Sequence, residues 1–362
     1  MTVYLANIIL TVIVAKAAEN AIFLKKIHKK RNGEISTFCI LLILSIWTFI
    51  YAYRGIEVGT DTSGYIGFYQ LLKQSTQSYV EYLEIAAEPL FESIKYFCCK
   101  VLNMNWVFFA FTIAVLTYFP VIYTVKKEGK RNFCFSLLLY IFLMFYYSGF
   151  NAMRQAVAVS ITFLSYYSFF KKKKYVKYFF CMFIAFNFHS TAVIAIPFHL
   201  ISKLELKSKR LWAIIGVLVL SVFAFPVVWN YATSLLLVVG KDYVDNSFSG
   251  SGYLRVVVCA VPVVIGLWKY RILKQVDEEI DQQIILLILA TFLLVFSTNN
   301  WLFARVADYC YIFAILYIPK LQYIFTENSR RLGKVLIGGL YFLYMIALML
   351  HGDANLYPYT FL

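Results

Sequence analysis

Long apolar runs recur along nearly the whole 362-residue chain, separated by short polar segments. A helix of about 20 apolar residues crosses the ~30 Å hydrocarbon core of a bilayer. The pattern predicts ten such helices, near residues 3–24, 36–53, 106–125, 133–148, 152–170, 211–229, 253–270, 284–298, 302–319 and 335–350. We therefore expect an all-α polytopic membrane protein that forms a single integral membrane domain over residues 1–362.

The composition agrees with this interpretation, because 61% of the residues are hydrophobic and only 15% are charged. A soluble domain of this size could not bury so much apolar surface. The net charge of +15 would suggest a nucleic-acid partner for a soluble protein. Here the basic residues fall in short clusters between apolar runs, and no nucleic-acid motif accompanies them. The clusters therefore predict topology in the bilayer and no nucleic-acid partner.

Most of the 34 Lys and Arg residues fall in six clusters between predicted helices. The clusters are Lys25–Arg31, Lys126–Arg131, Lys171–Lys177, Lys203–Arg210, Lys269–Lys274 and Lys320–Lys334. The positive-inside rule assigns all six to the cytoplasmic side. The other loops then face outward, among them the long segment 54–105 and the loop 241–255. We expect segment 54–105 to form short amphipathic helices on the membrane surface.

A single apolar stretch, residues 178–202, lies between two of these clusters. If both clusters are cytoplasmic, the stretch must enter the membrane and return. The plausible break points are Asn187, His189, Ser190 and Pro197. Each arm of about 12 residues would reach only ~18 Å at helical rise. We therefore expect a broken or re-entrant helical hairpin, lined by protein or a water-filled cavity. The alternative is one continuous span, which would place the following clusters on alternating sides.

Four arginines outside the clusters lie at the outer ends of predicted helices: Arg54, Arg154, Arg255 and Arg305. Each alone could simply extend to the membrane interface. Together they predict a cationic rim that binds diphosphate, because a guanidinium donates two hydrogen bonds at once. Arg154 is the strongest candidate. Asn151 is a good N-cap and would place Arg154 in the first turn of a helix, where a cation needs a compensating anion.

Other polar residues near these positions are candidates for binding or catalysis. Gln155 could donate to a sugar or phosphate oxygen. Asp308 follows Arg305 by three residues, so the two either form an ion pair between helices or orient a phosphate-binding arginine. His189 is either a core residue or helix cap, or a general base that activates an acceptor hydroxyl.

The outward segment supplies carboxylates that could grip sugar hydroxyls. Glu57, Asp61 and Tyr65 lie in the loop that begins at Arg54, although Asp61 or Thr62 could equally cap a short helix. Glu88 is a further candidate. No two carboxylates show a spacing typical of a glycosidase pair, and we expect neither a metal site nor a cofactor.

Five segments, taken in order, resemble the EpsG-like, Wzy-type polysaccharide polymerases of bacteria. They are RGIEVGTDTSGYIGFY (54–69), NAMRQAVAVSI (151–161), FHSTAVIAIP (188–197), WLFARVADYCYIFAILYIP (301–319) and NLYPYTFL (355–362). The resemblance spans most of the chain. It supports Asp61, Arg154, Gln155, His189, Arg305 and Asp308 as the positions on which function depends.

The resemblance implies a GT-C-type glycosyltransferase in the bacterial cytoplasmic membrane, independent of nucleotide sugars, with its site facing the periplasm or cell exterior. Such enzymes make O-antigen, capsule or exopolysaccharide from oligosaccharide units carried on undecaprenyl diphosphate. A chain-length regulator is a further candidate partner. Under this hypothesis Arg154 and Arg305 hold the donor's diphosphate, and His189 or Asp61 takes a proton from the acceptor hydroxyl.

Two other functions fit the same residues. One is a transporter or flippase of lipid-linked sugars, which would predict inverted repeats and charges near the bilayer midplane. The other is an O-antigen ligase-like glycosyltransferase. No repeat is visible and the four arginines cluster at one face, which favours the polymerase over the transporter.

Overall fold

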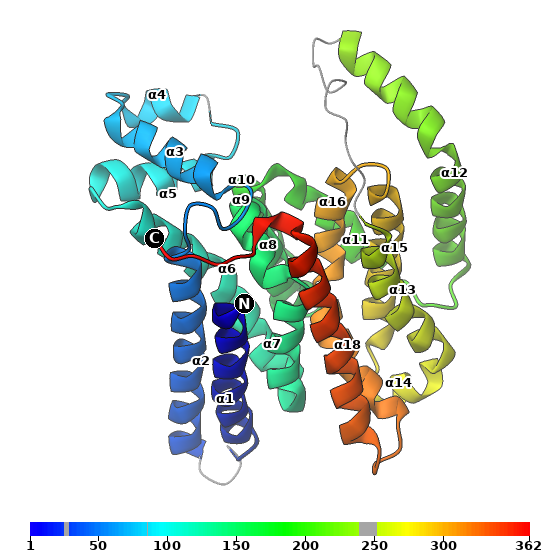
Figure 1. Cartoon of the computed structure of the whole chain (residues 1–362). Helices are drawn as coiled ribbons and strands as arrows, with labels where there is room; N and C mark the ends of the chain where they lie inside the picture. Colours follow the sequence, from blue (N-terminus) through cyan, green and yellow to red (C-terminus); the bar gives the residue numbers. More distant parts are fainter. Residues whose placement is uncertain (25–28, 85, 239–251) are drawn as a thin grey trace. The chain divides into compact units, whose positions relative to one another are not determined.

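The computed structural model describes residues 1–24, 29–84, 86–238 and 252–362, which are largely helical (Figure 1). Parts of two predicted loops, 25–31 and 241–255, lie outside these residues. The described chain divides into two compact units. Unit 1 contains residues 1–193 and 327–362, and unit 2 contains residues 194–326.

Unit 1 contains four helices that are long and apolar enough to cross a bilayer. They are α1 (Thr2–Leu24), α2 (Lys29–Ala52), α6 (Trp106–Gly129) and α18 (Arg330–His351). Helix α1 lies beside α2, and α2 packs against α6 (Figure 1). Unit 2 adds α15 (Ile280–Ser297) and the helical run Leu302–Ile324.

Six described helices therefore meet the requirements of a membrane span, or up to eight if each of two bent helix pairs is one span. The chain is thus a multi-pass membrane protein. All ten predicted spans fall on helices of the structure. The total of about ten crossings stays a prediction, because several of those helices are short or bent.

One bent pair lies at the centre of unit 1 and consists of α7 (Phe133–Phe142) and α8 (Phe145–Asn151), which meet at 42°. Met144 between them adopts the left-handed conformation, with φ of 69°. Helix α9 (Met153–Ser165) follows and continues into the π-helical turn η3 (Tyr166–Phe170). Helix α10 (Tyr175–Phe188) packs against α9.

Breaks in the chain leave backbone carbonyls that a membrane interior cannot hydrate. Buried tyrosines satisfy them in unit 1. The Tyr118 hydroxyl donates to the Tyr146 carbonyl at 3.0 Å, and the Tyr51 hydroxyl donates to the Gly149 carbonyl at 3.0 Å. Some of the 29 tyrosines of the chain thus stabilise the broken helices of unit 1.

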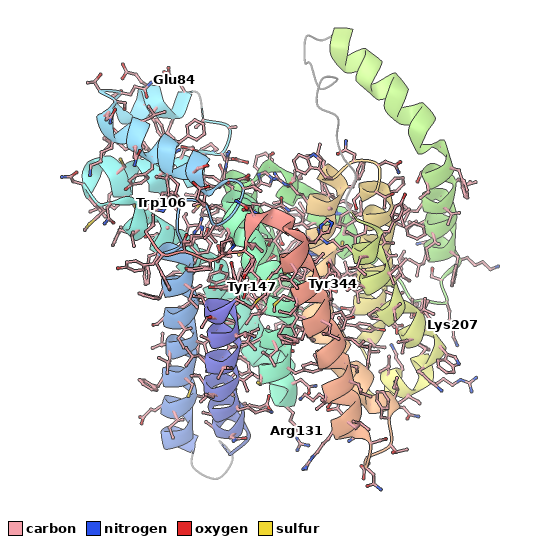
Figure 2. The ribbon with its side chains drawn as sticks, viewed as in Figure 1. Glu84, Trp106, Arg131, Tyr147, Lys207 and Tyr344 are labelled. Carbon is pink, nitrogen blue, oxygen red and sulfur yellow. The ribbon has the colours of Figure 1, made fainter. Side chains whose placement is uncertain are left out.

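The outward segment predicted at 54–105 contains four short helices. They are α3 (Thr62–Gln74), α4 (Tyr79–Glu84), α5 (Pro89–Tyr96) and η1 (Phe97–Val101). Figure 2 shows Glu84 of this segment at one end of unit 1 and Arg131, from a predicted cytoplasmic cluster, at the opposite end. Arg131 and the outward segment therefore lie at opposite ends of unit 1.

The last residues of the chain fold back onto the start of the outward segment. The Gly55 amide donates to the Thr360 carbonyl at 2.7 Å, and the Leu362 amide donates to the Tyr53 carbonyl at 3.0 Å. The Tyr4 hydroxyl donates to the Leu356 carbonyl. Both chain termini consequently lie at the end of unit 1 that holds α3 to α5 (Figure 1).

The stretch 178–202 is broken, as the sequence predicts. Helix α10 ends at Phe188, His189 is extended with φ of −160° and ψ of 119°, and two short helices follow, η4 (Ser190–Ile194) and α11 (Ala195–Ile201). The predicted break at His189 is confirmed. The return of the chain to the cytoplasmic side stays a prediction.

Unit 2 contains the second bent pair. Helices α13 (Tyr253–Trp268) and α14 (Tyr270–Val276) meet at 88°, and α15 packs against α13 and α16 (Leu302–Tyr311). Lys320 in the 3-10 turn η5 (Ile318–Ile324) pairs with Asp277, which directly follows α14. The unit also contains α12 (Lys209–Val238) and the short α17 (Ala314–Tyr317).

Candidate functional site

A carboxylate in unit 1 joins two of the predicted site residues. One oxygen of Glu88, Oε2, pairs with Nη1 of Arg154, and the other, Oε1, contacts Nδ1 of His189. Arg154 is 66 residues from Glu88 along the chain, and His189 is 101 residues away. The sequence indicates each of the three residues separately, and the structure brings them together.

Three helix ends position this cluster. Glu88 directly precedes α5, where Pro89 occupies the first turn and favours a helix start at that point. Arg154 is the second residue of α9, and His189 is the residue at which α10 stops. Helix α10 packs against both α5 and α9, so the three side chains converge on one place.

Exposure differs across the cluster. The Glu88 side chain is only 6% exposed, whereas His189 is 22% exposed and Arg154 is 39% exposed. Burial raises the pKa of Glu88, but hydrogen bonds from His189 and Arg154 outweigh burial and hold that pKa below its ordinary value. The cluster is therefore a buried, ionised carboxylate that presents a guanidinium and an imidazole toward solvent.

The contact to Glu88 also fixes the roles of the two imidazole nitrogens. A neutral His with Nδ1 against a carboxylate carries its proton on Nδ1, and Nε2 is then the acceptor. Nε2 is therefore the atom that can take a proton from a hydroxyl group.

The predicted place of Arg154 in the first turn of a helix is confirmed. The predicted N-cap is wrong, because Asn151 ends α8 and the capping position falls on Ala152. The side-chain amide of Asn151 (Nδ2) instead donates to the Ala354 carbonyl at 3.1 Å. Glu88 supplies the negative charge that a cation at this helix end requires, so the exposed part of the guanidinium remains for a ligand.

Two aromatic residues of the outward segment surround Arg154. Its guanidinium lies 5.7 Å from the ring centroid of Phe91, and the Tyr65 hydroxyl also interacts with it. The rings of Tyr65 and Phe91 are 6.4 Å apart. Tyr65, predicted as a sugar-binding residue, is therefore a neighbour of the cluster.

Two other predicted diphosphate ligands of unit 1 are buried. Gln155 is 3% exposed, which favours a packing role. Arg54 is fully buried, and its donors reach Thr62 Oγ1 at 3.1 Å and the Tyr51 carbonyl at 2.5 Å.

A third donor of Arg54 reaches the carbonyl of Phe150 at 3.4 Å, at the C-terminal end of α8. A cation is favourable at a helix C-terminus, where carbonyls lack partners within the helix. This arrangement favours a structural role for Arg54, since it offers no exposed surface to a diphosphate.

The loop that carries Glu57 and Asp61 lies against the same part of the chain. Asp61 precedes α3 without capping it, and its carboxylate accepts a hydrogen bond from Thr60 at 2.9 Å. Gly59 has φ of 96°, and a Cβ there would lie 2.5 Å from Asn151 Oδ1. Glycine thus lets this loop approach the residues just before Arg154. Glu57 is exposed.

In unit 2, Asp308 forms an ion pair with Arg255. Arg255 Nη2 lies 2.5 Å from Asp308 Oδ1 and joins α13 to α16. Arg305 stacks on Trp301, with its guanidinium 4.4 Å from the ring centroid, and also interacts electrostatically with Asp308. The predicted ion pair between helices joined Asp308 to Arg305, but both of these residues lie on α16. The ion pair that joins two helices is Arg255–Asp308.

The four arginines predicted as one rim thus belong to different units. Arg54 and Arg154 lie in unit 1, and Arg255 and Arg305 lie in unit 2.

Within the described residues, no group of three His, Cys, Asp or Glu side chains could hold a metal ion.

The contacts of Glu88 with Arg154 and His189 are the feature of the site that the sequence indicates least clearly. A Glu-Pro pair before a short amphipathic helix marks it as a helix start, but that pattern is common and carries no information on partners. Its link to Arg154 and His189 depends on the packing of α10 against α5 and α9.

Comparison with known proteins places the chain in a family. The model of the EpsG family matches residues 36–361, which include every predicted site residue in both units. No curated protein and no solved structure matches the chain, so the likeness to GT-C enzymes stays a prediction. Since the match covers nearly all of the sequence, the chain belongs to the EpsG family.

Proposed function

We propose that the protein is a polysaccharide polymerase that joins oligosaccharide repeat units carried on undecaprenyl diphosphate. It acts at the outer face of the bacterial cytoplasmic membrane. Membership of the EpsG family and the many apolar helices support this proposal. The observation that carries it is the cluster in which Glu88 holds Arg154 and His189.

The cluster contains the two groups that such a transfer requires. The bond between the anomeric carbon of the growing chain and its diphosphate oxygen breaks, and a bond from that carbon to the acceptor hydroxyl oxygen forms. His189 Nε2 takes the hydroxyl proton. Arg154 stabilises the negative charge that develops on the departing diphosphate, because a guanidinium held in place by a carboxylate donates charge-assisted hydrogen bonds to an anion.

Glu88 is a positioning residue in this mechanism. It holds the imidazole in the tautomer that accepts a proton at Nε2 and stabilises the imidazolium that forms, as the carboxylate does in a Ser-His-Asp triad. It also fixes the guanidinium beside the imidazole. Asp61 is the alternative base, and Glu57 and Tyr65 are proposed to contact the sugars.

Arg305 and the Arg255–Asp308 pair are proposed as additional binding residues for phosphate or sugar. The alternative function is a transporter of lipid-linked sugars. The Arg255–Asp308 pair and the 88° bend between α13 and α14 are the observations that would favour it. A transporter would move its substrate without making a glycosidic bond, so the products of the two functions differ.

The test is a gel of surface polysaccharide from cells in which the gene is deleted and then restored. Wild type should restore a ladder of polymer, whereas Arg154→Ala and His189→Ala should leave single repeat units. Removing one charge-stabilising donor typically costs about 10²–10³-fold in rate. Arg131→Ala, at the opposite end of unit 1, is the matched control and should restore the ladder.

Protein levels in the membrane must be equal for all variants. A normal ladder from Arg154→Ala would contradict the assignment. If deletion abolishes even single surface units, the transporter or the ligase-like function replaces the polymerase.

A further inference from the structure

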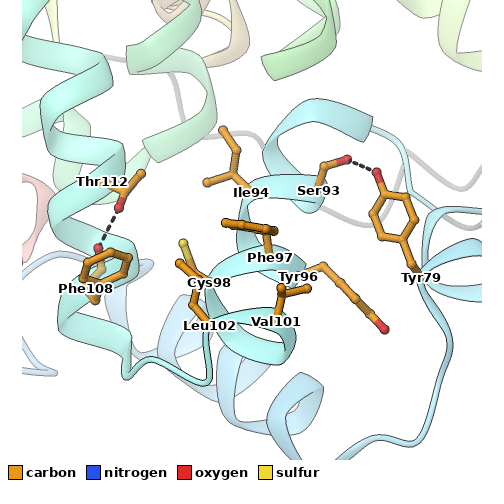
Figure 3. A pocket seen from close by; sticks show the side chains of 10 residues that line it. All are labelled: Tyr79, Ser93, Ile94, Tyr96, Phe97, Cys98, Val101, Leu102, Phe108 and Thr112. Carbon is orange, nitrogen blue, oxygen red and sulfur yellow. Dashed lines mark hydrogen bonds between the residues drawn. The ribbon is translucent and has the colours of Figure 1, made fainter.

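An apolar groove lies in the outward segment of unit 1 (Figure 3). Its volume is about 650 Å³, and its walls come from α4, α5, η1 and the start of α6. Ile94, Phe97 and Val101 line one side, and Phe108 lines the other. The residues that line it include no charged side chain.

The groove leaves large apolar side chains uncovered. Phe97 is 51% exposed, Val101 60% and Phe108 38%. Contiguous exposed apolar surface of this kind marks a binding site for an apolar group. An apolar occupant would cover these side chains.

The groove is continuous with an exposed apolar face of α6. Phe108 and Thr112 lie on α6, which is a membrane span, and the same helix exposes Phe111, Phe119 and Tyr123 further along. These positions recur at helical spacing and so form one face of α6. An apolar chain can pass from the bilayer into the groove along this face without crossing water, which favours a lipid chain over a soluble sugar.

Helix α5 connects the groove to the Glu88 cluster. Glu88 precedes the helix, Phe91 contacts Arg154 from its buried face, and Ile94 lines the groove. At 1.5 Å rise per residue, Ile94 lies about 9 Å from Glu88 along the axis. A lipid whose diphosphate is at Arg154 could therefore lay its first carbons along α5 into the groove.

We propose that this groove holds the isoprenoid chain of the polyprenyl diphosphate that carries the sugar. The inference rests on the proposed function, since it places the diphosphate of that same substrate at Arg154. The groove binds the lipid chain of the substrate, so that the sugar extends from Arg154 toward the outer surface.

The test uses the full-length protein in lipid nanodiscs with a diazirine-bearing polyprenyl diphosphate that carries no sugar. After illumination, mass spectrometry should find the label on peptides that contain residues 94–112. Excess unlabelled undecaprenyl diphosphate should remove the label, and excess phosphatidylglycerol should not. Because the probe has no sugar, labelling does not depend on polymerase activity.

Substitutions provide the matched controls. Ile94→Trp should fill the groove and reduce labelling at least fivefold, and Val101→Trp, at its exposed rim, should also reduce it if Ile94→Trp does not fold. Leu71→Trp, on the exposed face of α3 and outside the groove, should leave labelling unchanged. Thermal unfolding of each variant confirms folding.

Labelling elsewhere, or labelling that phosphatidylglycerol removes equally well, would overturn the proposal and make the groove a site for ordinary bilayer lipid. Groove labelling that polyprenyl diphosphate alone removes would support it even if polymer synthesis were not found. The experiment can therefore refute lipid binding in the groove without refuting the polymerase function, and the reverse.

Discussion

At the scale of single residues, one buried carboxylate determines what its two neighbours can do. A cation in the first turn of a helix is unfavourable by itself, and a histidine at a helix break has no fixed orientation. Glu88 compensates the charge of Arg154 with one carboxylate oxygen and orients the imidazole of His189 with the other. Arg154 keeps 39% of its side chain exposed while its charge is balanced. We expect the same carboxylate to link stability to pH.

Glu88→Gln should lower stability at neutral pH and remove one source of acid sensitivity. The native pKa of Glu88 lies below its ordinary value of 4.5, so its contribution is complete above that pH and is lost as pH falls through the native pKa. We expect a loss of about 1–2 kcal/mol at pH 7, since Arg154 is partly exposed. Thermal unfolding in detergent at several pH values measures this difference.

The difference between wild type and Glu88→Gln should shrink below pH 4.5. Arg154 and His189 face position 88 in both proteins, and the Arg154 guanidinium stays charged over this whole pH range. A difference that stays constant from pH 7 to pH 3 would show that the Glu88 charge does not stabilise the fold.

At the scale of elements, the site is built from places where helices stop. Helix α8 ends at Asn151, α9 begins at Met153, α10 ends at Phe188 and α5 begins at Pro89. Carbonyls left by these breaks are satisfied by buried tyrosines and by Arg54, so the breaks are stable inside a membrane protein. The C-terminal tail holds the neighbouring loop in place, and its docking can be tested directly.

Gly55→Ala should displace the tail. A Cβ at Gly55 would lie 2.0 Å from Thr360 Oγ1 and 3.2 Å from the Thr360 carbonyl oxygen. We expect a loss of about 1–3 kcal/mol from this overpacking. Removing the hydroxyl in Gly55→Ala/Thr360→Ala should restore much of the loss, and Gly64→Ala, which meets no atom within 4 Å, is the control.

Protease accessibility of the tail and thermal unfolding report the effect. Equal stability for Gly55→Ala and Gly64→Ala would mean that the tail contributes nothing at Gly55.

At the scale of the whole molecule, sequence patterns predict the helices better than the site. Apolar runs locate all ten helical regions, and the polar residues around His189 locate a break, because both signals are local in the chain. Arg154 and His189 are identifiable as candidates for the same reason. Their connection through Glu88 is not, since it joins residues 66 and 101 positions apart.

The role of Arg54 was beyond prediction for a related reason. The Phe150 carbonyl that Arg54 binds lies where α8 ends at Asn151, and no proline follows to mark that end in the sequence. The sequence shows an arginine at the end of an apolar run, and only the fold shows which helix end it completes.

The membrane topology is testable at this scale. In the hairpin topology, positions 174 and 207 both face the cytoplasm. Single cysteines at Lys174→Cys and Lys207→Cys should react with a membrane-impermeant maleimide only after permeabilisation. Ser63→Cys, in the outward segment, should react in intact cells, against a background of native cysteines that are buried or half-buried. Labelling of only one of positions 174 and 207 in intact cells would show that residues 178–202 cross once.

The most direct test of the central claim is polymer synthesis by the purified protein. Wild type in nanodiscs should convert undecaprenyl-diphosphate-linked repeat units into a ladder of longer lipid-linked chains, followed by gel and mass spectrometry. Arg154→Ala and His189→Ala should fold normally and slow chain growth by about 10²-fold or more. Chain growth at the wild-type rate in either variant, or no growth by folded wild type, would contradict the account.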